Sequence, residues 1–259
     1  MPRKQKVAFL HGWGLNRKIW THVTRRLTHE YPHFECQLLD LPGYGGMADI
    51  QNASNLESLA QHCLNQLSEP AVLVGWSLGG MVAMQAALFD QAESESRITG
   101  LQLITTSPKF VASSDWPSGV DLSTFQRFSD ELASDYERTL TMFLLLQAGA
   151  SAGSRELARS AHAAICDLPP PSAKTLQDGI DCLANSDLRP RLHELTLPVQ
   201  VVSGLRDRVA KPESSAQLAG LLGAELIEFN AGHSPFMTKP DEYVQTLSDF
   251  VQKIDRQGD

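Results

Sequence analysis

Residues 72–82 read Val72-Leu73-Val74-Gly75-Trp76-Ser77-Leu78-Gly79-Gly80-Met81-Val82. A short apolar run, typical of a buried strand, meets a glycine and a serine, and residues 81–88 then predict a buried helix. The pattern Gly75-x-Ser77-x-Gly79 is typical of a serine nucleophile on a tight strand-to-helix turn. Glycine lacks the Cβ that would collide with neighbouring strands at such a turn. The stretch therefore predicts a serine nucleophile beside the N–H groups and positive dipole of a helix N-terminus.

Strand-like and helix-like segments alternate on both sides of this stretch. We expect strands at 7–10, 34–39, 98–105, 197–204 and 224–229, and helices at 16–28, 56–67, 212–222 and 240–254. This alternation predicts an α/β fold with a mostly parallel, twisted sheet and helices on both faces.

The alternation fails between about residues 108 and 190. Only helical spacing is found there, at 125–132, 136–147, 155–166 and 173–184. We interpret this stretch as a helical cap inserted between two strands of the sheet. The core would then comprise residues 1–107 and 191–259, and the cap residues 108–190.

Composition excludes several classes of protein. The 259 residues carry a formal net charge of −8, which argues against a nucleic-acid binder. No run approaches the ~18 apolar residues of a membrane span, and no spaced His/Cys cluster or HExxH motif indicates a metal. Residues 1–6 lead into a strand without the apolar region of a signal peptide. We therefore expect a cytoplasmic protein without metal or cofactor, and with reduced cysteines: Cys36, Cys63, Cys166 and Cys182.

A serine hydroxyl attacks an ester only with help from a base, and that base needs an acid to fix its tautomer. In the strand-turn-helix arrangement the three follow in the order Ser, Asp or Glu, His, at successive strand ends. His233 follows the last predicted strand and Asp207 the penultimate one. The acid can also stand one strand earlier, but residues 106–108 offer no carboxylate. The predicted catalytic residues are thus Ser77, Asp207 and His233, while His11 is interpreted as structural and the other histidines as surface or packing residues.

A glycine-flanked turn, His11-Gly12-Trp13-Gly14, follows the first predicted strand. This is where the second donor of an oxyanion hole stands in folds of this kind. We predict the backbone N–H groups of Trp13 and Leu78 as the two donors. The alternative is a plain turn with Trp13 packed into the core. The glycine-rich loop 43–46 opens no phosphate-binding helix and does not indicate a nucleotide site.

Several stretches together carry a resemblance to a known family: His11-Gly12-Trp13-Gly14-Leu15-Asn16, Gly75-Trp76-Ser77-Leu78-Gly79-Gly80, Ser107-Pro108, Asp115-Trp116-Pro117, Glu137-Arg138-Thr139, Phe143-Leu144-Leu145-Leu146-Gln147 and Gly232-His233-Ser234-Pro235-Phe236. On these stretches the chain resembles the α/β-hydrolase superfamily and, more narrowly, the pimeloyl-[acyl-carrier protein] methyl ester esterase family of bacterial biotin synthesis. The cap segments are the most specific part of the resemblance, because caps vary most between hydrolases.

The resemblance implies an α/β-hydrolase fold, hydrolysis of a pimeloyl methyl ester on acyl-carrier protein, and a cytoplasmic monomer that also accepts small esters. It implies cap arginines that hold the acidic carrier, here Arg138, Arg155 and Arg159, whereas Met142 stands where a further basic residue is expected. The residues implied to contact substrate are Trp13, Ser77, Leu78, Phe143, Leu144, Leu145, Leu146, Gln147 and His233.

Two alternatives remain open. The chain could be a broad short-chain esterase or C–C hydrolase of the same fold, since fold alone assigns no substrate. It could also be a hydrolase-fold ligand receptor that retains the three catalytic residue types. Turnover of a simple ester that is lost with Ser77 would distinguish an enzyme from a receptor.

Overall fold

Six strands in the described part of the chain lie in one parallel sheet. The computed structural model describes residues 4–50, 53–148 and 152–258, without the side chains of 125, 129, 143–148, 152–157, 160, 257 and 258. The sheet has the order β2-β1-β3-β4-β5-β6. Its strands are β1 (Gln5–Leu10), β2 (Phe34–Leu39), β3 (Ala71–Trp76), β4 (Ile98–Ile104), β5 (Val199–Gly204) and β6 (Glu225–Phe229).

The strand order reverses beside β1. The chain runs from β1 outward to β2 and then returns to the other side of β1 to form β3. Loops that follow β1 and β3 therefore diverge at the carboxyl edge, which is where open parallel sheets bind their ligands. The predicted turn 11–14 and Ser77 lie in these two loops.

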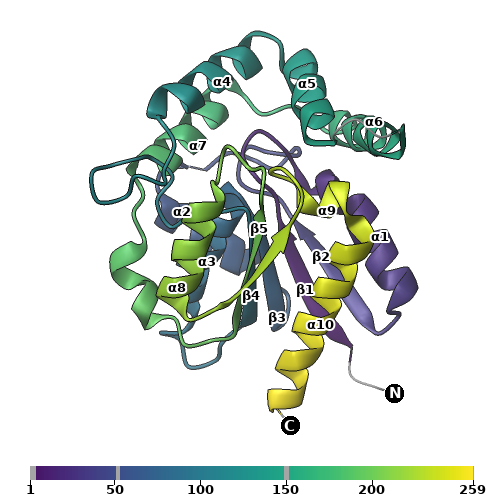
Figure 1. Cartoon of the computed structure of the whole chain (residues 1–259), viewed down its shortest axis with the longest axis vertical. Coiled ribbons are helices and arrows are strands. Elements are labelled where there is room, and N and C mark those ends of the chain that lie inside the picture. Colours follow the sequence, from purple (N-terminus) through teal and green to yellow (C-terminus); the bar gives the residue numbers. More distant parts are fainter. Residues whose placement is uncertain (1–3, 51–52, 149–151, 259) are drawn as a thin grey trace.

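Helices cover both faces of the sheet (Figure 1). One face carries α2 (Leu56–Gln66), α3 (Leu78–Asp90) and α8 (Pro212–Leu222), and the other carries α1 (Thr21–Glu30) and α10 (Pro240–Gly258). Side chains of β1 alternate between two apolar clusters, with Ala8 and Leu10 in one and Val7 and Phe9 in the other. This period of two explains why strands buried on both faces are apolar throughout. The α/β fold predicted from the sequence, a parallel sheet with helices on both faces, is confirmed.

Four helices stand between β4 and β5 and lie across the carboxyl edge of the sheet (Figure 1). They are α4 (Leu122–Ser134), α5 (Tyr136–Ala148), α6 (Ala152–Cys166) and α7 (Ala173–Asn185). Hydrogen bonds attach them to the loop after β1, and two of these involve α5 and α6. The Tyr136 hydroxyl donates to the carbonyl of Gly14 at 2.9 Å, and the Asn16 amide to the carbonyl of Ile165 at 3.0 Å. The boundaries 108 and 190 of the cap stay a prediction.

Short helices account for the differences from the predicted elements. The helix expected at 16–28 is divided into a 3₁₀ turn, η1 (Arg17–Trp20), and α1, and Asn16 caps it by accepting from the N–H of Lys18 at 3.1 Å. Neither η2 (Arg189–Glu194) nor α9 (Pro235–Thr238) was expected. They have six and four residues, begin at or next to a proline, and are too short to show a helical period. None of the helices described is both long and apolar enough to span a bilayer.

Candidate active site

Ser77 lies between β3 and α3 with φ 55° and ψ −121°, a strained conformation for a residue with a side chain. The two flanking glycines make this turn possible. A Cβ on Gly75 would lie 2.5 Å from the carbonyl oxygen of Gly79, and one on Gly79 would lie 2.4 Å from the carbonyl oxygen of His11. These contacts involve backbone atoms, which cannot rotate away as a side chain can. The glycine spacing therefore reflects close packing of the turn against itself and against the end of β1.

Asp207 and His233 form the closest side-chain contact in the candidate site. Nδ1 of His233 lies 2.7 Å from Oδ2 of Asp207, and Oδ1 accepts from the N–H groups of Val209 at 2.7 Å and Ala210 at 3.2 Å. A carboxylate only accepts hydrogen bonds, so the network assigns the proton to Nδ1 and leaves Nε2 with its lone pair. An imidazole in this tautomer is suited to remove a proton from a serine hydroxyl.

The three predicted catalytic residues follow three different strands at the same edge of the sheet. Ser77 follows β3, Asp207 follows β5 and His233 follows β6. All three are buried, with exposed fractions of 7%, 5% and 4%. The ring of Trp76, the residue before the serine, lies 5.5 Å from the imidazole ring of His233. The fold thus places residues that are far apart in the chain at one edge of the sheet. Ser77 and His233 are separated by 156 positions in the sequence.

The turn after β1 lies against Ser77. A Cβ on Gly12 would lie 3.3 Å from the Cβ of Ser77. Leu78 is the first residue of α3, so its N–H has no partner within the helix. The N–H of Trp13 makes no hydrogen bond to another described residue. Both amides are therefore free to bind an oxyanion beside the serine, which is the role predicted for them.

The side chain of Trp13 contacts the cap. Its indole N–H donates to the carbonyl of Leu176 in α7 at 3.0 Å, and its ring meets that of Phe128 in α4 edge-on, with centroids 5.5 Å apart. A Cβ on Gly179 would lie 2.6 Å from the indole. Packing of Trp13 and its predicted role as an oxyanion donor do not exclude each other. The indole ring packs against the cap, whereas the backbone N–H stays free.

His11 is fully buried and shapes the same turn. Its Nδ1 donates to the carbonyl of Gly12 at 2.7 Å, and its Nε2 accepts from the N–H of Leu41 at 3.1 Å. Burial lowers the pKa of His11, and the nearby carboxylate of Asp40 opposes this shift. Asp40 is also buried and pairs with Arg17. These contacts agree with the structural role predicted for this histidine.

The predicted cap contacts are described only in part. Arg138 and Arg159 are exposed and form no ion pair with any described residue. The side chain of Arg155, like those of Phe143, Leu144, Leu145, Leu146 and Gln147, lies outside the described residues. Within the described chain no group of acidic, histidine or cysteine side chains is arranged to hold a metal ion.

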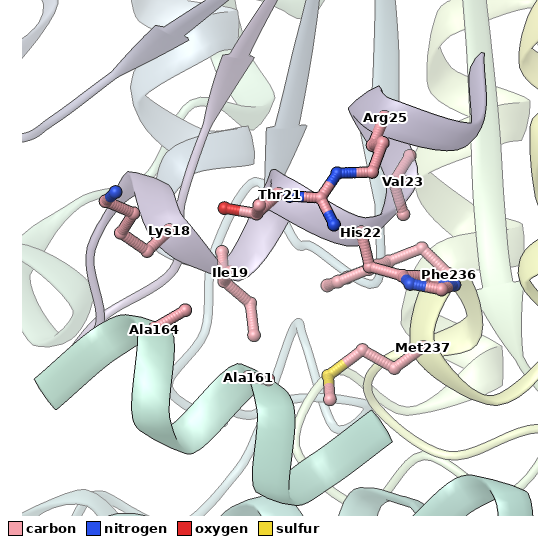
Figure 2. Close-up of a pocket in the computed structure, with 10 residues that line it drawn as sticks. All are labelled: Lys18, Ile19, Thr21, His22, Val23, Arg25, Ala161, Ala164, Phe236 and Met237. Atoms are coloured by element: carbon pink, nitrogen blue, oxygen red, sulfur yellow. The ribbon is translucent and has the colours of Figure 1, made fainter. Parts of the chain in front are cut away.

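A hollow of about 170 Å³ lies between η1, α1, α6 and α9 (Figure 2). None of the predicted catalytic residues lines it, so it is separate from the candidate active site. Phe236, one of its lining residues, packs against the rings of Trp20 and Trp76 at centroid distances of 4.4 and 5.2 Å. Its lining residues are Lys18, Ile19, Thr21, His22, Val23, Arg25, Ala161, Ala164, Phe236 and Met237.

Two residues of the site were missed by sequence reasoning. Trp76 and Thr105 donate hydrogen bonds to the backbone carbonyl of His233 at 2.7 and 2.8 Å. Trp76 lies within the stretch 72–82 and Thr105 is the last residue of the strand predicted at 98–105, and neither pattern indicates a contact with His233. The sequence carries no periodic signal for such contacts, because each joins residues more than 120 positions apart.

Comparisons with known proteins agree with this geometry. A model of the Alpha/beta hydrolase family matches residues 7–246. The pimeloyl-[acyl-carrier protein] methyl ester esterase of Vibrio vulnificus is 34% identical over 95% of this chain and 94% of its own length. The enzyme of the same name from Serratia marcescens is 35% identical over 96% and 94%. An esterase from Exiguobacterium antarcticum has a TM-score of 0.82 at 24% identity, covering 97% of this chain and 93% of its own, a likeness that concerns the fold.

Proposed function

Because this chain belongs to the α/β-hydrolase family, we propose that it is a serine carboxylesterase that hydrolyses the methyl ester of a pimeloyl group on acyl-carrier protein. Relatives with this name match nearly the whole chain at 33–35% identity. The observation that carries the proposal is the buried pair of His233 and Asp207, which stands at the same edge of the sheet as a serine on a tight glycine turn.

In the first half of the reaction the hydroxyl of Ser77 attacks the ester carbonyl while Nε2 of His233 removes its proton. Asp207 holds the Nδ1 proton and stabilises the imidazolium that forms. The N–H groups of Trp13 and Leu78 bind the oxyanion of the tetrahedral intermediate. That intermediate collapses as His233 returns its proton to the methoxide, so that methanol leaves and an acyl-enzyme remains.

In the second half a water molecule attacks the acyl-enzyme. His233 takes a proton from this water as it adds to the carbonyl, and then gives the proton to the oxygen of Ser77 as that bond breaks. The product is a carboxylic acid on the carrier, and the serine is restored. The burial of all three catalytic side chains keeps bulk water from competing for these hydrogen bonds.

The experiment compares parent and Ser77→Ala protein on two substrates, a short p-nitrophenyl ester and a carrier-bound pimeloyl methyl ester. Removal of a serine nucleophile typically lowers kcat by roughly 10⁴- to 10⁶-fold. We expect losses of this order on both substrates and an unchanged thermal unfolding midpoint, because alanine keeps the Cβ and removes only the hydroxyl. Mass spectrometry of the carrier should show loss of the methyl group with parent protein only. Turnover of both esters by folded Ser77→Ala would overturn the proposed mechanism.

Substrate class is tested separately from mechanism. We expect a higher kcat/KM for the carrier-bound methyl ester than for the same methyl ester free in solution. Equal values would instead support a broad esterase, and binding of the ester without turnover would support a receptor.

A further inference from the structure

The backbone carbonyl of His233 accepts two hydrogen bonds from buried side chains. The indole Nε1–H of Trp76 donates at 2.7 Å and the hydroxyl of Thr105 at 2.8 Å. Trp76 is 1% exposed and Thr105 is fully buried. A carbonyl oxygen has two lone pairs, so both are used here. Trp76 is the last residue of β3 and Thr105 directly follows β4, so two central strands hold the loop that carries the histidine.

Thr105 is held in a conformation that β-branched residues rarely adopt. Its φ is +40°, and among the described non-glycine residues it shares a positive φ only with Ser77. Its N–H donates to the carbonyl of Val202 in β5 at 2.7 Å. A strained backbone of this kind persists only where its surroundings enforce it, and it is frequent at active sites.

The next residue makes the equivalent contact with the nucleophile. The hydroxyl of Thr106 donates to the backbone carbonyl of Ser77 at 2.7 Å, and the N–H of Ser77 donates to the carbonyl of Ile104 at 3.0 Å. Consecutive threonines at the end of β4 therefore hold the main chains of the predicted nucleophile and the predicted base.

The indole of Trp76, which also donates to the carbonyl of His233, packs against other aromatic rings. Trp76 packs edge-on against Trp20 and Phe236, with centroid distances of 6.4 and 5.2 Å. Trp20 is itself fully buried and belongs to η1, a different segment from the one that carries His233, so it holds the indole independently of that segment. The indole is therefore a rigid donor.

We propose that Thr105 and Trp76 are positioning residues that set the distance from His233 to Ser77 by holding the histidine's backbone carbonyl. Asp207 fixes the imidazole only through Nδ1, and a ring with one anchored atom still moves with its main chain. The two donors remove that freedom. Displacement of a catalytic group by about 1 Å can cost on the order of 100-fold in rate. This inference rests on the proposed role of His233 as the base.

The test separates the hydroxyl of Thr105 from its size and shape. Thr105→Ser keeps the hydroxyl, Thr105→Val keeps the branched shape without it, and Thr105→Ala removes both. Thr105→Ala also removes the branched side chain that is crowded at positive φ, so we expect this variant without the hydroxyl to fold. The matched control is Thr24→Val in α1, which deletes a buried hydroxyl bond to the carbonyl of Trp20 at 3.0 Å.

We expect kcat to depend on whether residue 105 carries a hydroxyl, and the free energy of unfolding to depend on the size and shape of its side chain. Thr105→Val and Thr105→Ala should both lower kcat on the short ester by at least about tenfold, with little change in KM. Thr105→Ser should stay close to the parent. Phosphonylation of Ser77 by a p-nitrophenyl phosphonate should slow in the same order, and Trp76→Phe should resemble Thr105→Val. Thr24→Val should lower the unfolding midpoint without this loss of kcat.

Two results would count against the inference. Equal kcat for Thr105→Ser and Thr105→Ala would show that the hydroxyl does not position the base. Losses in Thr105→Val no larger than those in Thr24→Val would show a general effect on stability. The variant His233→Ala separates this inference from the proposed function. If it is inactive, either result counts only against the positioning role of Thr105 and Trp76. If it is active, His233 is not the base and the proposed function itself is wrong.

Discussion

Oδ2 of Asp207 lies 2.7 Å from Nδ1 of His233, while its other oxygen accepts from two backbone N–H groups, those of Val209 and Ala210. The backbone contacts prevent the carboxylate from rotating, so a fixed acceptor faces the imidazole. An asparagine at this position could accept the same backbone hydrogen bonds through its amide oxygen. Its NH₂ group would then face Nδ1 and favour the tautomer that protonates Nε2.

Asp207→Asn should therefore fold normally and lose activity. A histidine with its proton on Nε2 cannot accept one from the serine, and this wrong tautomer lowers kcat by roughly 10⁴-fold in a serine protease. We expect a loss of that order on the short p-nitrophenyl ester, with the urea midpoint close to the parent value. Activity within about tenfold of the parent would mean that Asp207 does not orient the base.

Gly79 should not tolerate even one added methyl group. Its Cβ would lie 2.4 Å from the carbonyl oxygen of His11 and 2.6 Å from that of Leu10. Crowding of a packed site costs about 1–3 kcal/mol, and relief here would move the turn that carries Trp13. We expect Gly79→Ala to lower both the free energy of unfolding and kcat.

Gly220 provides the matched control for that substitution. It lies within α8, and a Cβ there would meet nothing within 4 Å. Gly220→Ala should raise the free energy of unfolding by about 0.5–1 kcal/mol and leave kcat unchanged. If Gly79→Ala were as stable and active as Gly220→Ala, the close packing of the serine turn against β1 would be disproved.

The places of the three candidate catalytic residues could be predicted because each follows a strand with a local signal. Ser77 stands between glycines, and Asp207 and His233 follow the two final apolar strands. Parallel strands all end at the same edge of a sheet, so the position of the three residues directly after strands predicted that they lie at one edge. The buried character of α3 could be predicted in the same way, since an unbroken apolar run has no exposed face.

The contacts that position these residues could not be predicted. The positive φ of Thr105 and the bond from Trp76 to His233 depend on packing between distant segments. No spacing rule relates an indole to a carbonyl 157 residues later in the chain. The short helices η2 and α9 were not predicted for a different reason, since segments of six and four residues are too short to show a helical repeat.

The buried His11 should make the protein less stable in mild acid. Burial lowers its pKa below the ordinary value of 6.5, and its Nε2 is already occupied as an acceptor for the N–H of Leu41. As the pH falls below about 6.5, the unfolded chain gains this proton before the folded protein does. The contribution of neutral His11 to stability is therefore fully present above that pH and is lost progressively below it, down to the lowered pKa.

Urea unfolding of parent protein and His11→Asn at about pH 7.5 and about pH 5.5 measures this effect on either side of the ordinary histidine pKa. Asparagine does not titrate and can replace both hydrogen bonds. The free energy of unfolding should fall more between the two pH values in the parent than in His11→Asn, because carboxylate titration is common to both. An equal fall would show that His11 is protonated in the folded protein as readily as in the unfolded chain.

Charge reversal on the cap tests how the carrier binds. Arg138 in α5 and Arg159 in α6 are exposed and unpaired among the described residues, and these two helices pack together. Attraction between exposed charges acts mainly on the rate of encounter and is screened by salt. The double variant Arg138→Glu/Arg159→Glu should lower kcat/KM for the carrier-bound ester by at least about tenfold at low salt. The loss should shrink as salt is added.

Two controls separate docking from catalysis and from net charge. The short p-nitrophenyl ester needs no docking, so its kcat/KM should not change in the double variant. Lys253→Glu reverses one charge on α10, whose C-terminal end lies away from the cap (Figure 1), and should leave the carrier-bound reaction close to that of the parent. Comparable losses on both esters would show that Arg138 and Arg159 support the cap rather than bind the partner. A loss that persisted at high salt would likewise contradict electrostatic docking, because screened surface charges could not produce it.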